Sequence, residues 1–263
     1  MEEYLKIAVF VKQVPDSAAK VALENGVVSW GDAPLVINPW DEYAVEAALS
    51  LTEQHGGEVT AISLGDESAK EALKHALAMG CGHAILISDP ALKGIDSAGV
   101  ARVCAAAVQK LADIDVAVFG KQAIDSDTGL TAAMAARILG WPALTLVASI
   151  AQLDPAAKTI RVQRGIEEGR QIVEGKLPAV ISIVKDFGEP RYPSFMGIRK
   201  ASKAEIPSLT LAELGTQAPE AKITWPELIS PPKRKVTNEM ITGASADEIA
   251  ANLADKIIAE GVL

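Results

Sequence analysis

Short apolar runs alternate with longer amphipathic stretches through the first half of the chain. Each run is nearly uninterrupted, which is typical of a parallel strand covered on both faces. The runs lie at 5–11, 58–63, 84–87 and 116–119. The stretches between them predict helices that begin near 39, 69, 97 and 131. This alternation predicts an α/β fold, with a doubly wound and mostly parallel sheet and right-handed crossovers.

One segment interrupts the alternation where a simple strand–helix–strand unit would have its first helix. Within residues 17–37, positions 24–27 read Glu-Asn-Gly-Val, and this sequence is typical of a hairpin turn. Residues 38–41 read Asn-Pro-Trp-Asp and open a helix, because proline suits the first helical position. We expect Asp41 to cap or stabilise the first turn of that helix.

The pattern changes after Pro142. Alternating segments joined by short turns, with no helix between them, predict an antiparallel or mixed extension of the sheet. These segments lie at 145–150, 159–163, 170–174 and 179–184.

The C-terminal part of the chain is rich in proline, and we divide the chain into an α/β domain at 1–205 and an arm at 206–263. The arm ends in a predicted helix, with Ser245 as the N-cap and Glu248 placed for a capping box. Such a segment is either a disordered linker or an arm that wraps another subunit. The apolar residues within 225–229 favour the wrapping arm, because disordered segments are poor in them.

Composition narrows the class of protein. The 263 residues are 49% hydrophobic and 4% aromatic, which suffices for one large α/β domain with an aliphatic core. The net charge of −9 argues against general nucleic-acid binding, which needs a basic footprint. Cys81 and Cys104 stand in apolar periodic context, so we expect buried free thiols and a reducing compartment.

Other sequence signals predict neither a metal site nor a membrane span. The three histidines lack partners at metal-ligand spacing, and no apolar run reaches the ~18 residues of a spanning helix. The acidic N-terminus leads directly into a strand and is typical of neither a secretory signal nor an Arg-rich transit peptide. We therefore expect a cytoplasmic protein.

Polar loops follow three of the predicted strands, and carboxyl ends of parallel strands form the edge where open α/β sheets bind ligands. The loops lie at 10–14, 64–68 and 120–131, with 38–41 beside them. The last loop opens a helix, whose N–H groups and dipole suit a phosphate. We predict an adenine-nucleotide pocket in which Gly120 allows a close approach, Asp125 holds a ribose hydroxyl and Thr131 binds phosphate.

A second interpretation of residues 125–128 is that they only cap the helix. Two carboxylates near a phosphate are unfavourable unless they point away or a cation lies between them. Two common nucleotide motifs are also absent. No Gly-x-Gly-x-x-Gly follows the first strand, and Gly120-Lys121 lacks the upstream glycine and the following Ser or Thr of a P-loop. No nucleophile–base pair emerges, so we predict no hydrolase.

Residues 189–200 place apolar side chains between turn residues and a basic run. One interpretation is a surface loop whose apolar residues fold back into the core. The other is an exposed anchor for a partner protein, because an aromatic residue flanked by arginine is typical of binding hot spots.

Six segments resemble the beta subunit of electron transfer flavoprotein, in the order of that family. They read VKQVPD at 11–16, NPWDEYAVE at 38–46, ALAMG at 76–80, GKQAIDSD at 120–127, KLPAV at 176–180 and EPRY at 189–192. The resemblance covers residues 5 to about 205, keeps the spacing of the central loop without gaps, and extends to the placement of the arm.

This resemblance implies a heterodimer with an alpha subunit, which holds most of the electron-carrying FAD in a mobile domain. The chain itself would be a scaffold and an electron carrier subunit, not an enzyme, and would bind AMP structurally. The implied AMP-binding residues are Phe10, Asn38, Pro39, Trp40, Asp41, Leu64, Gly120, Lys121, Gln122, Ala123, Ile124, Asp125, Ser126, Asp127, Thr128, Gly129, Leu130 and Thr131.

The resemblance also implies a recognition loop for acyl-CoA dehydrogenases or a similar flavin dehydrogenase. Its residues are Arg191, Tyr192, Pro193, Ser194, Phe195, Met196, Gly197, Ile198, Arg199 and Lys200. Phe195 occupies the anchor position where the family has leucine, so the partner's pocket is expected to differ. Gly165 replaces an acidic residue that in the family resembles a contact for the swinging flavin domain.

The loop at 125–131 is intermediate between two forms of the family. Electron-bifurcating members carry a second FAD in the AMP position and use NADH. Thr131 resembles the AMP type, which we prefer, whereas Thr128 and residues 40–43 lean toward the bifurcating type. A stand-alone nucleotide sensor of the universal-stress type is a further alternative, against which the long arm argues. An ATP pyrophosphatase would need a Ser-Gly-Gly-type loop where residues 12–15 stand.

Overall fold

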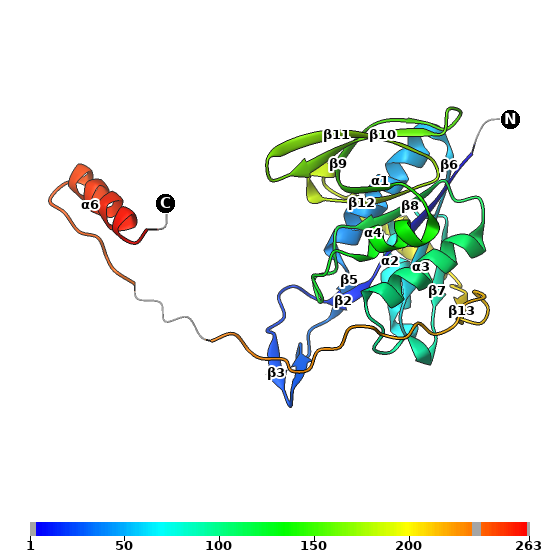
Figure 1. Cartoon of the computed structure of the whole chain (residues 1–263), viewed down its shortest axis with the longest axis horizontal. Coiled ribbons are helices and arrows are strands. Elements are labelled where there is room, and N and C mark those ends of the chain that lie inside the picture. The colour runs from blue at the N-terminus through cyan, green and yellow to red at the C-terminus, as the bar shows by residue number, and fades with distance from the viewer. Residues whose placement is uncertain (1–3, 233–237, 262–263) are drawn as a thin grey trace. The chain divides into compact units, whose positions relative to one another are not determined.

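The computed structural model describes residues 4–232 and 238–261 and divides into two units, Met1–Glu227 and Leu228–Leu263 (Figure 1). The first three residues and 233–237, which belong to the predicted acidic N-terminus and arm, lie outside the described residues. Each unit is described by itself below.

A nine-stranded sheet forms the centre of the first unit, in the order β11-β10-β9-β12-β8-β1-β6-β7-β13. Its strands are β1 Leu5–Phe10, β6 Gly57–Leu64, β7 His83–Ile87, β8 Val116–Gly120, β9 Ala143–Asp154, β10 Thr159–Ile166, β11 Gly169–Lys176, β12 Ala179–Ile183 and β13 Ser208–Leu209. The strands β12, β8, β1, β6 and β7 run parallel, which confirms the predicted doubly wound α/β fold.

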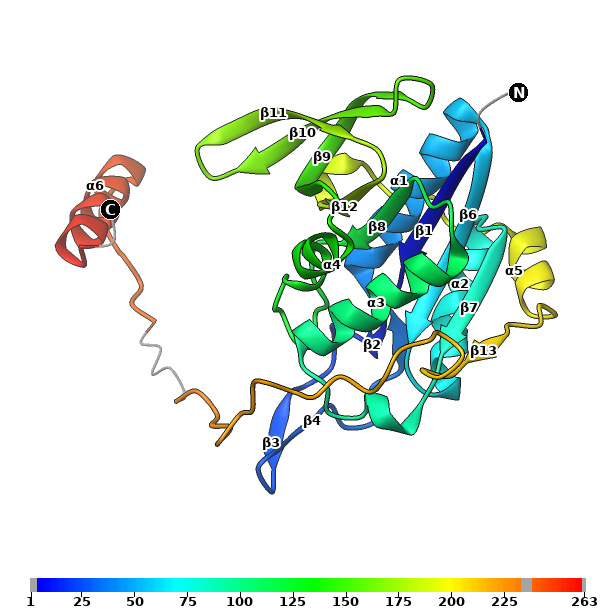
Figure 2. The same cartoon turned by 45° about the vertical axis from the view of Figure 1, so that its right-hand side comes forward.

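Helices cover both faces of this sheet. The main ones are α1 Pro39–His55, α2 Lys70–Met79, α3 Ser97–Leu111 and α4 Thr131–Leu139. Figure 2 shows α1 and α2 on one side of the sheet and α3 and α4 on the other. Alternate residues of β1 point to opposite faces: Ile7 and Val9 join the core under α1 and α2, whereas Ala8 and Phe10 join the core under α3 and α4. Because both faces are covered, every residue of β8 and β12 is buried.

The insertion before α1 contains the predicted hairpin. It comprises β2 Gln13–Pro15, β3 Ala22–Glu24, β4 Val27–Ser29 and β5 Leu35–Ile37. Asn25 and Gly26 both have positive φ, 53° and 77°, as a two-residue hairpin turn requires. The pairing of β2 with β5 closes the base of the insertion and returns the chain to the sheet edge at Asn38.

The predicted extension of the sheet is mixed, as expected. β9, β10 and β11 pair antiparallel, whereas β12 is parallel to both β8 and β9. Short 3₁₀ turns at Glu67–Ala69, Pro90–Leu92 and Lys185–Phe187 complete the connections, and α5 Phe195–Ala201 follows the last of them.

The segment at 206–227 belongs structurally to the first unit, beyond the boundary that we placed at 205. β13 pairs parallel with β7, and Leu86 and Ser88 donate backbone hydrogen bonds to the carbonyls of Pro207 and Leu209. Ile206, Leu211 and Leu214 are buried against the two cores or their margins. This stretch is too irregular to show a period, so its sequence alone reads as a loop.

The second unit contains α6 Ala246–Ala259. The hydroxyl of Ser245 accepts a hydrogen bond from the N–H of Glu248, which confirms the predicted cap. The Glu248 carboxylate accepts in return from Ala244, one residue earlier than in a standard capping box. Nowhere in residues 4–232 and 238–261 does a helix combine the length and apolar character needed to cross a membrane.

Candidate nucleotide site

A cavity of about 270 Å³ lies at the carboxyl edge of the sheet, where the loops after β1, β6 and β8 meet the start of α1. Parallel neighbours end at the same edge, so residues far apart in sequence become adjacent there. The predicted residues that line it are Phe10, Asn38, Asp41, Leu64, Gly120, Lys121, Gln122, Ala123, Ser126, Thr128, Gly129 and Thr131.

Two stacked aromatic rings form an apolar wall of this cavity. Phe10 and Phe119 hold equivalent positions on β1 and β8, and their ring centroids lie 4.4 Å apart with an interplanar angle of 8°. Leu64, Val100 and Cys104 add further apolar surface. Such a wall suits a flat, weakly polar group such as a nucleobase.

Asn38 holds the loop after β8 in place. Its fully buried amide donates to the carbonyl of Gln122 at 2.9 Å and accepts from the N–H of Ile124 at 3.2 Å. Both directions of the amide are therefore used, which fixes the distance between the start of α1 and the 120–131 loop.

Asp41 lies in the first turn of α1, as expected, but makes no capping hydrogen bond there. Its carboxylate accepts a hydrogen bond from the backbone N–H of Lys12 at 2.8 Å, so it ties α1 to the loop after β1. Burial raises the pKa of Asp41 to about 7, although hydrogen bonds from Asn38, Lys12 and Gly120 oppose that rise. A charged carboxylate is costly here because it lies 6% exposed beside the cavity.

Gly120 lines the cavity and also allows a close approach within the protein itself. A Cβ at this position would lie 2.3 Å from the Asp41 Oδ1 atom and 2.7 Å from the carbonyl of Trp40. The missing side chain therefore allows α1 to approach β8 closely. It makes room for protein backbone at the floor of the site.

The two aspartates of the loop are each engaged by a neighbour. Lys12 Nζ lies 2.7 Å from both carboxylate oxygens of Asp125, and Gln122 donates a hydrogen bond to Asp127. Neither aspartate lines the cavity. The predicted ribose contact of Asp125 stays a prediction, and its carboxylate is already paired with a cation.

The start of α4 forms one end of the cavity. Asp127 and Gly129 have φ values of 52° and 61°, which turn the loop sharply into the helix. Leu130 precedes the helix and carries no side-chain oxygen, so it cannot cap the first-turn N–H groups. Thr131 lines the cavity, and its predicted contact with a phosphate stays a prediction.

A family comparison fits this geometry. The Electron transfer flavoprotein domain model matches residues 26–214, which include most of the cavity and all of the parallel sheet except β1. The chain belongs to the electron transfer flavoprotein family.

Two relatives are similar to this chain over nearly their whole length, and a third is similar over about four-fifths of it. The electron transfer flavoprotein subunit beta of Thermoanaerobacterium thermosaccharolyticum is 33% identical and is covered over 98% of this chain and 100% of its own. The caffeyl-CoA reductase-Etf complex subunit CarD of Acetobacterium woodii is 34% identical over 96% and 98%, respectively. Protein FixA of Azorhizobium caulinodans is 36% identical over 81% and 78%. The resemblance to beta subunits of the family is thereby confirmed.

The structure adds residues to the flavoprotein site and moves others out of it. Val11 and Lys12 line the cavity within the predicted loop 10–14. Residues that line it without having been predicted are Ile95, Asp96, Ser97, Val100, Cys104, Phe119 and Ala132. Predicted residues that do not line it are Pro39, Trp40, Ile124, Asp125, Asp127 and Leu130. Most of the added residues come from the start of α3. Asp96 caps that helix, accepting from Gly99 at 2.7 Å, and an Asp-Ser pair before a helix was the available signal.

Residues 191–200 lie away from the cavity and form an exposed apolar surface. Tyr192, Phe195, Met196 and Ile198 are 95%, 80%, 67% and 53% exposed. The alternative in which these side chains fold back into the core is therefore wrong. Cys81 and Cys104 are buried free thiols, as expected.

Proposed function

We propose that this beta subunit binds AMP as a structural ligand and pairs with an alpha subunit that holds the FAD, so that the heterodimer carries electrons from a flavin dehydrogenase to an acceptor. The observation that carries the proposal is the cavity, which combines an aromatic wall with a helix N-terminus. At about 270 Å³ it lies close to the lower end of the usual small-molecule range of roughly 300–1,000 Å³. That size suits a mononucleotide better than a dinucleotide.

The residues present fit AMP in chemical kind. Phe10 and Phe119 would lie against the adenine, and the first-turn N–H groups of α4 with the Thr131 hydroxyl would bind the phosphate. Lys12 keeps the Asp125 carboxylate from repelling that phosphate. FAD supplies the redox chemistry when bound, and this chain supplies position and support.

The proposed docking surface for the electron donor is the exposed face of α5. Phe195, Met196 and Ile198 provide the apolar part, and Arg199 and Lys200 follow on the same short helix. The name of the CarD relative places that protein in a caffeyl-CoA reductase complex. A CoA-ester dehydrogenase or reductase with an acidic rim around an apolar pocket is therefore the kind of partner that we propose here.

We also propose that the arm, with α6, packs on the alpha subunit in a cytoplasmic heterodimer. In the described part of this unit, no residue of α6 is buried. Its apolar residues Ile249, Leu253 and Ile258 are 38%, 46% and 65% exposed. An amphipathic helix with that much uncovered apolar surface is typical of one that packs on another chain.

Cofactor stoichiometry tests the proposal. The chain would be co-expressed with its alpha subunit, and the purified heterodimer extracted with acid and analysed by chromatography. We expect one FAD and one AMP per heterodimer. Two FAD and no AMP would overturn the AMP site in favour of a bifurcating subunit. A stable monomer with bound adenine nucleotide, and no association with the alpha subunit, would favour a stand-alone sensor.

A further inference from the structure

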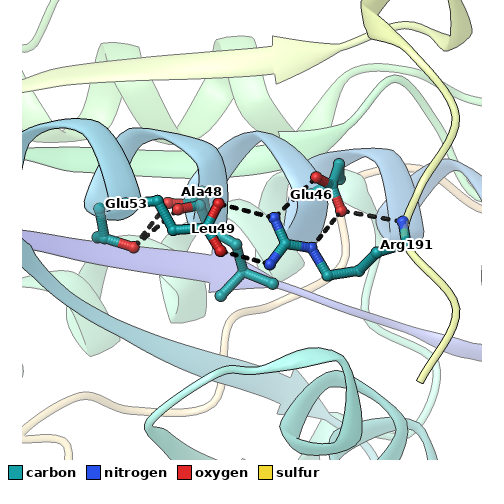
Figure 3. Close-up of polar contacts among 6 residues, drawn as sticks. Glu46, Ala48, Leu49, Glu53 and Arg191 are labelled. Carbon is teal, nitrogen blue, oxygen red and sulfur yellow. Dashed lines mark hydrogen bonds and ion pairs between the residues drawn. The ribbon is translucent and has the colours of Figure 1, made fainter. Parts of the chain in front are cut away.

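Arg191 lies just before α5 and binds two glutamates of α1, Glu46 and Glu53 (Figure 3). Its Nε and Nη2 atoms donate to Glu46 at 2.8 and 2.9 Å, and its Nη1 and Nη2 atoms donate to Glu53 at 2.5 and 3.0 Å. Its backbone N–H donates to Glu46 as well, at 3.0 Å. One residue is therefore held to α1 by five hydrogen bonds.

The geometry of this ion pair makes it a clamp. Glu46 and Glu53 are seven positions apart on α1, so both project from one face of the helix, two turns apart. The planar guanidinium fills the space between them, and each carboxylate takes two of its donors. Arg191 stays protonated, because Glu53 and Glu46 hold the pKa of its guanidinium above its ordinary value. The clamp is thus charged throughout the physiological range of pH.

A second feature, close packing at Gly197, holds α5 against the end of α2. A Cβ on Gly197 would lie 2.3 Å from the carbonyl oxygen of Ala78, so α5 packs against the end of α2 at backbone distance. The Ser194 hydroxyl caps the helix, accepting from the N–H of Gly197 at 3.0 Å. Ala201 closes the last turn and is 3% exposed.

The Arg191 clamp and the close packing at Gly197 fix the orientation of α5 and leave one face of this helix uncovered. Arg191 stands four residues before Phe195, between Pro190 and Pro193, which restrict the backbone on either side. The exposed Phe195 and Met196 therefore stand on a short helix that is anchored at both ends. A loop that needed ordering on binding would lose affinity, because ordering costs conformational entropy.

We propose that Arg191 and Gly197 are positioning residues, which hold α5 in the orientation that the electron-donating dehydrogenase recognises and do not themselves contact it. This inference rests on the proposed function of α5 as the docking surface. In this inference the Glu46–Arg191–Glu53 clamp holds α5 in its binding orientation before the donor arrives.

The test compares heterodimers that carry Arg191→Lys, Phe195→Ala or the matched control Arg161→Lys. Lysine keeps the charge and loses the planar fork. Arg161 forms an Arg–Glu pair with Glu174 on β10 and β11, away from α5. The electron donor is a purified acyl-CoA dehydrogenase with its acyl-CoA substrate, and flavin reduction is followed by absorbance. Hydrogen exchange of the α5 amides is measured in parallel by mass spectrometry.

For Arg191→Lys we expect a KM for the dehydrogenase that rises roughly tenfold, a saturating rate within about twofold, and unchanged FAD and AMP content. The amides of 195–201 should exchange faster in this variant, whereas Arg161→Lys should match the wild type in every measurement. If Gly197 positions α5, the rise in KM should be smaller in Gly197→Ser than in Gly197→Val, since the bulkier side chain displaces α5 further.

The outcomes separate this inference from the docking proposal. An unchanged KM in Phe195→Ala would overturn the docking proposal. A raised KM in Phe195→Ala with a wild-type KM and wild-type exchange in Arg191→Lys would overturn the positioning role alone. Exchange needs no donor, so it decides whether Arg191 orders α5 even if the dehydrogenase is the wrong one.

Discussion

Lys12 and Asp125, 113 residues apart in sequence, form an ion pair in which Nζ lies 2.7 Å from both carboxylate oxygens. Lys12 follows β1 and Asp125 follows β8, so the pair joins two neighbouring loops at the edge of the sheet. It also meets the objection that two carboxylates beside a phosphate are unfavourable. The Lys12 ammonium pairs with the carboxylate of Asp125, and the amide of Gln122 donates a hydrogen bond to the carboxylate of Asp127.

Replacing Lys12 with methionine should weaken AMP binding. The substitution keeps much of the side-chain length and leaves the Asp125 carboxylate unpaired close to the phosphate site. We expect a loss of roughly tenfold in affinity, which calorimetry on nucleotide-stripped heterodimer would measure. Lys158→Met is the matched control, because Lys158 pairs with Asp115 at 3.1 Å at the opposite end of β8. Equal affinities in both variants would contradict the role of Lys12.

Replacing Gly120 with alanine should destabilise the fold. The added Cβ would meet Asp41 at 2.3 Å and the backbone of Trp40 at 2.7 Å, and neither backbone nor buried carboxylate can move without disturbing the start of α1. We expect a loss of about 3 kcal/mol in the free energy of unfolding, measured by urea denaturation of the heterodimer.

Gly165→Ala provides the control for this change. Within the described part of the chain no atom lies within 4 Å of a Cβ at position 165. Alanine there should be neutral or stabilise by up to about 1 kcal/mol, because it restricts the unfolded chain. A loss of similar size in both variants would show that strand glycines in general, rather than the contact with Asp41, set the effect.

The elements that a period can reveal were predictable from the sequence. The helix expected at 97–111 is α3, and the Asn25-Gly26 turn forms the hairpin. Period and turn chemistry are local properties, so they survive without knowledge of the fold. α5 has seven residues, too few to show a period, and its sequence read only as a loop.

Partners across the sheet could not be predicted in the same way. That the strand-end loops gather at one edge follows from parallel pairing, and the cavity contains most of the residues predicted for it. Which side chain meets which depends on register and crossover path. Asp41 thus bonds to Lys12 and makes no capping hydrogen bond to its own helix. Asp96 is signalled as the N-cap of α3 by the Asp-Ser pair, but its place at the cavity depends on how that helix crosses the sheet.

Asp41 should make stability depend on pH. Burial raises the pKa of its carboxyl from 3.8 to about 7 in the folded protein, so the folded state holds the proton more tightly than the unfolded state. The associated stabilisation is complete below about pH 3.8 and is lost as the pH rises through about 7. The difference is up to about 4 kcal/mol.

Asp41→Asn separates this contribution from those of other titrating groups. Asparagine stays neutral, so unfolding free energies of the variant should fall less than those of the wild type between pH 5 and 7.5 in urea titrations. The variant is expected to lose some stability at every pH, because one acceptor oxygen is replaced. Parallel curves for the two proteins would show that Asp41 keeps an ordinary pKa.

The side chain at position 195 should set which dehydrogenase is recognised. Phe195 is 80% exposed on α5. The family resemblance implies leucine at this position, so in the proposed docking role phenylalanine would offer a longer and flatter anchor to the partner's pocket. Truncation to alanine should raise the KM for the native donor about tenfold or more and leave AMP and FAD content intact, because the side chain is remote from the cavity. Phe195→Leu should lose less with that donor and gain with a dehydrogenase whose usual carrier presents leucine. The KM values for both donors, measured by steady-state reduction of the wild-type, Phe195→Ala and Phe195→Leu heterodimers, test this change in donor preference. If alanine, leucine and phenylalanine give the same KM with each donor, position 195 is not the anchor.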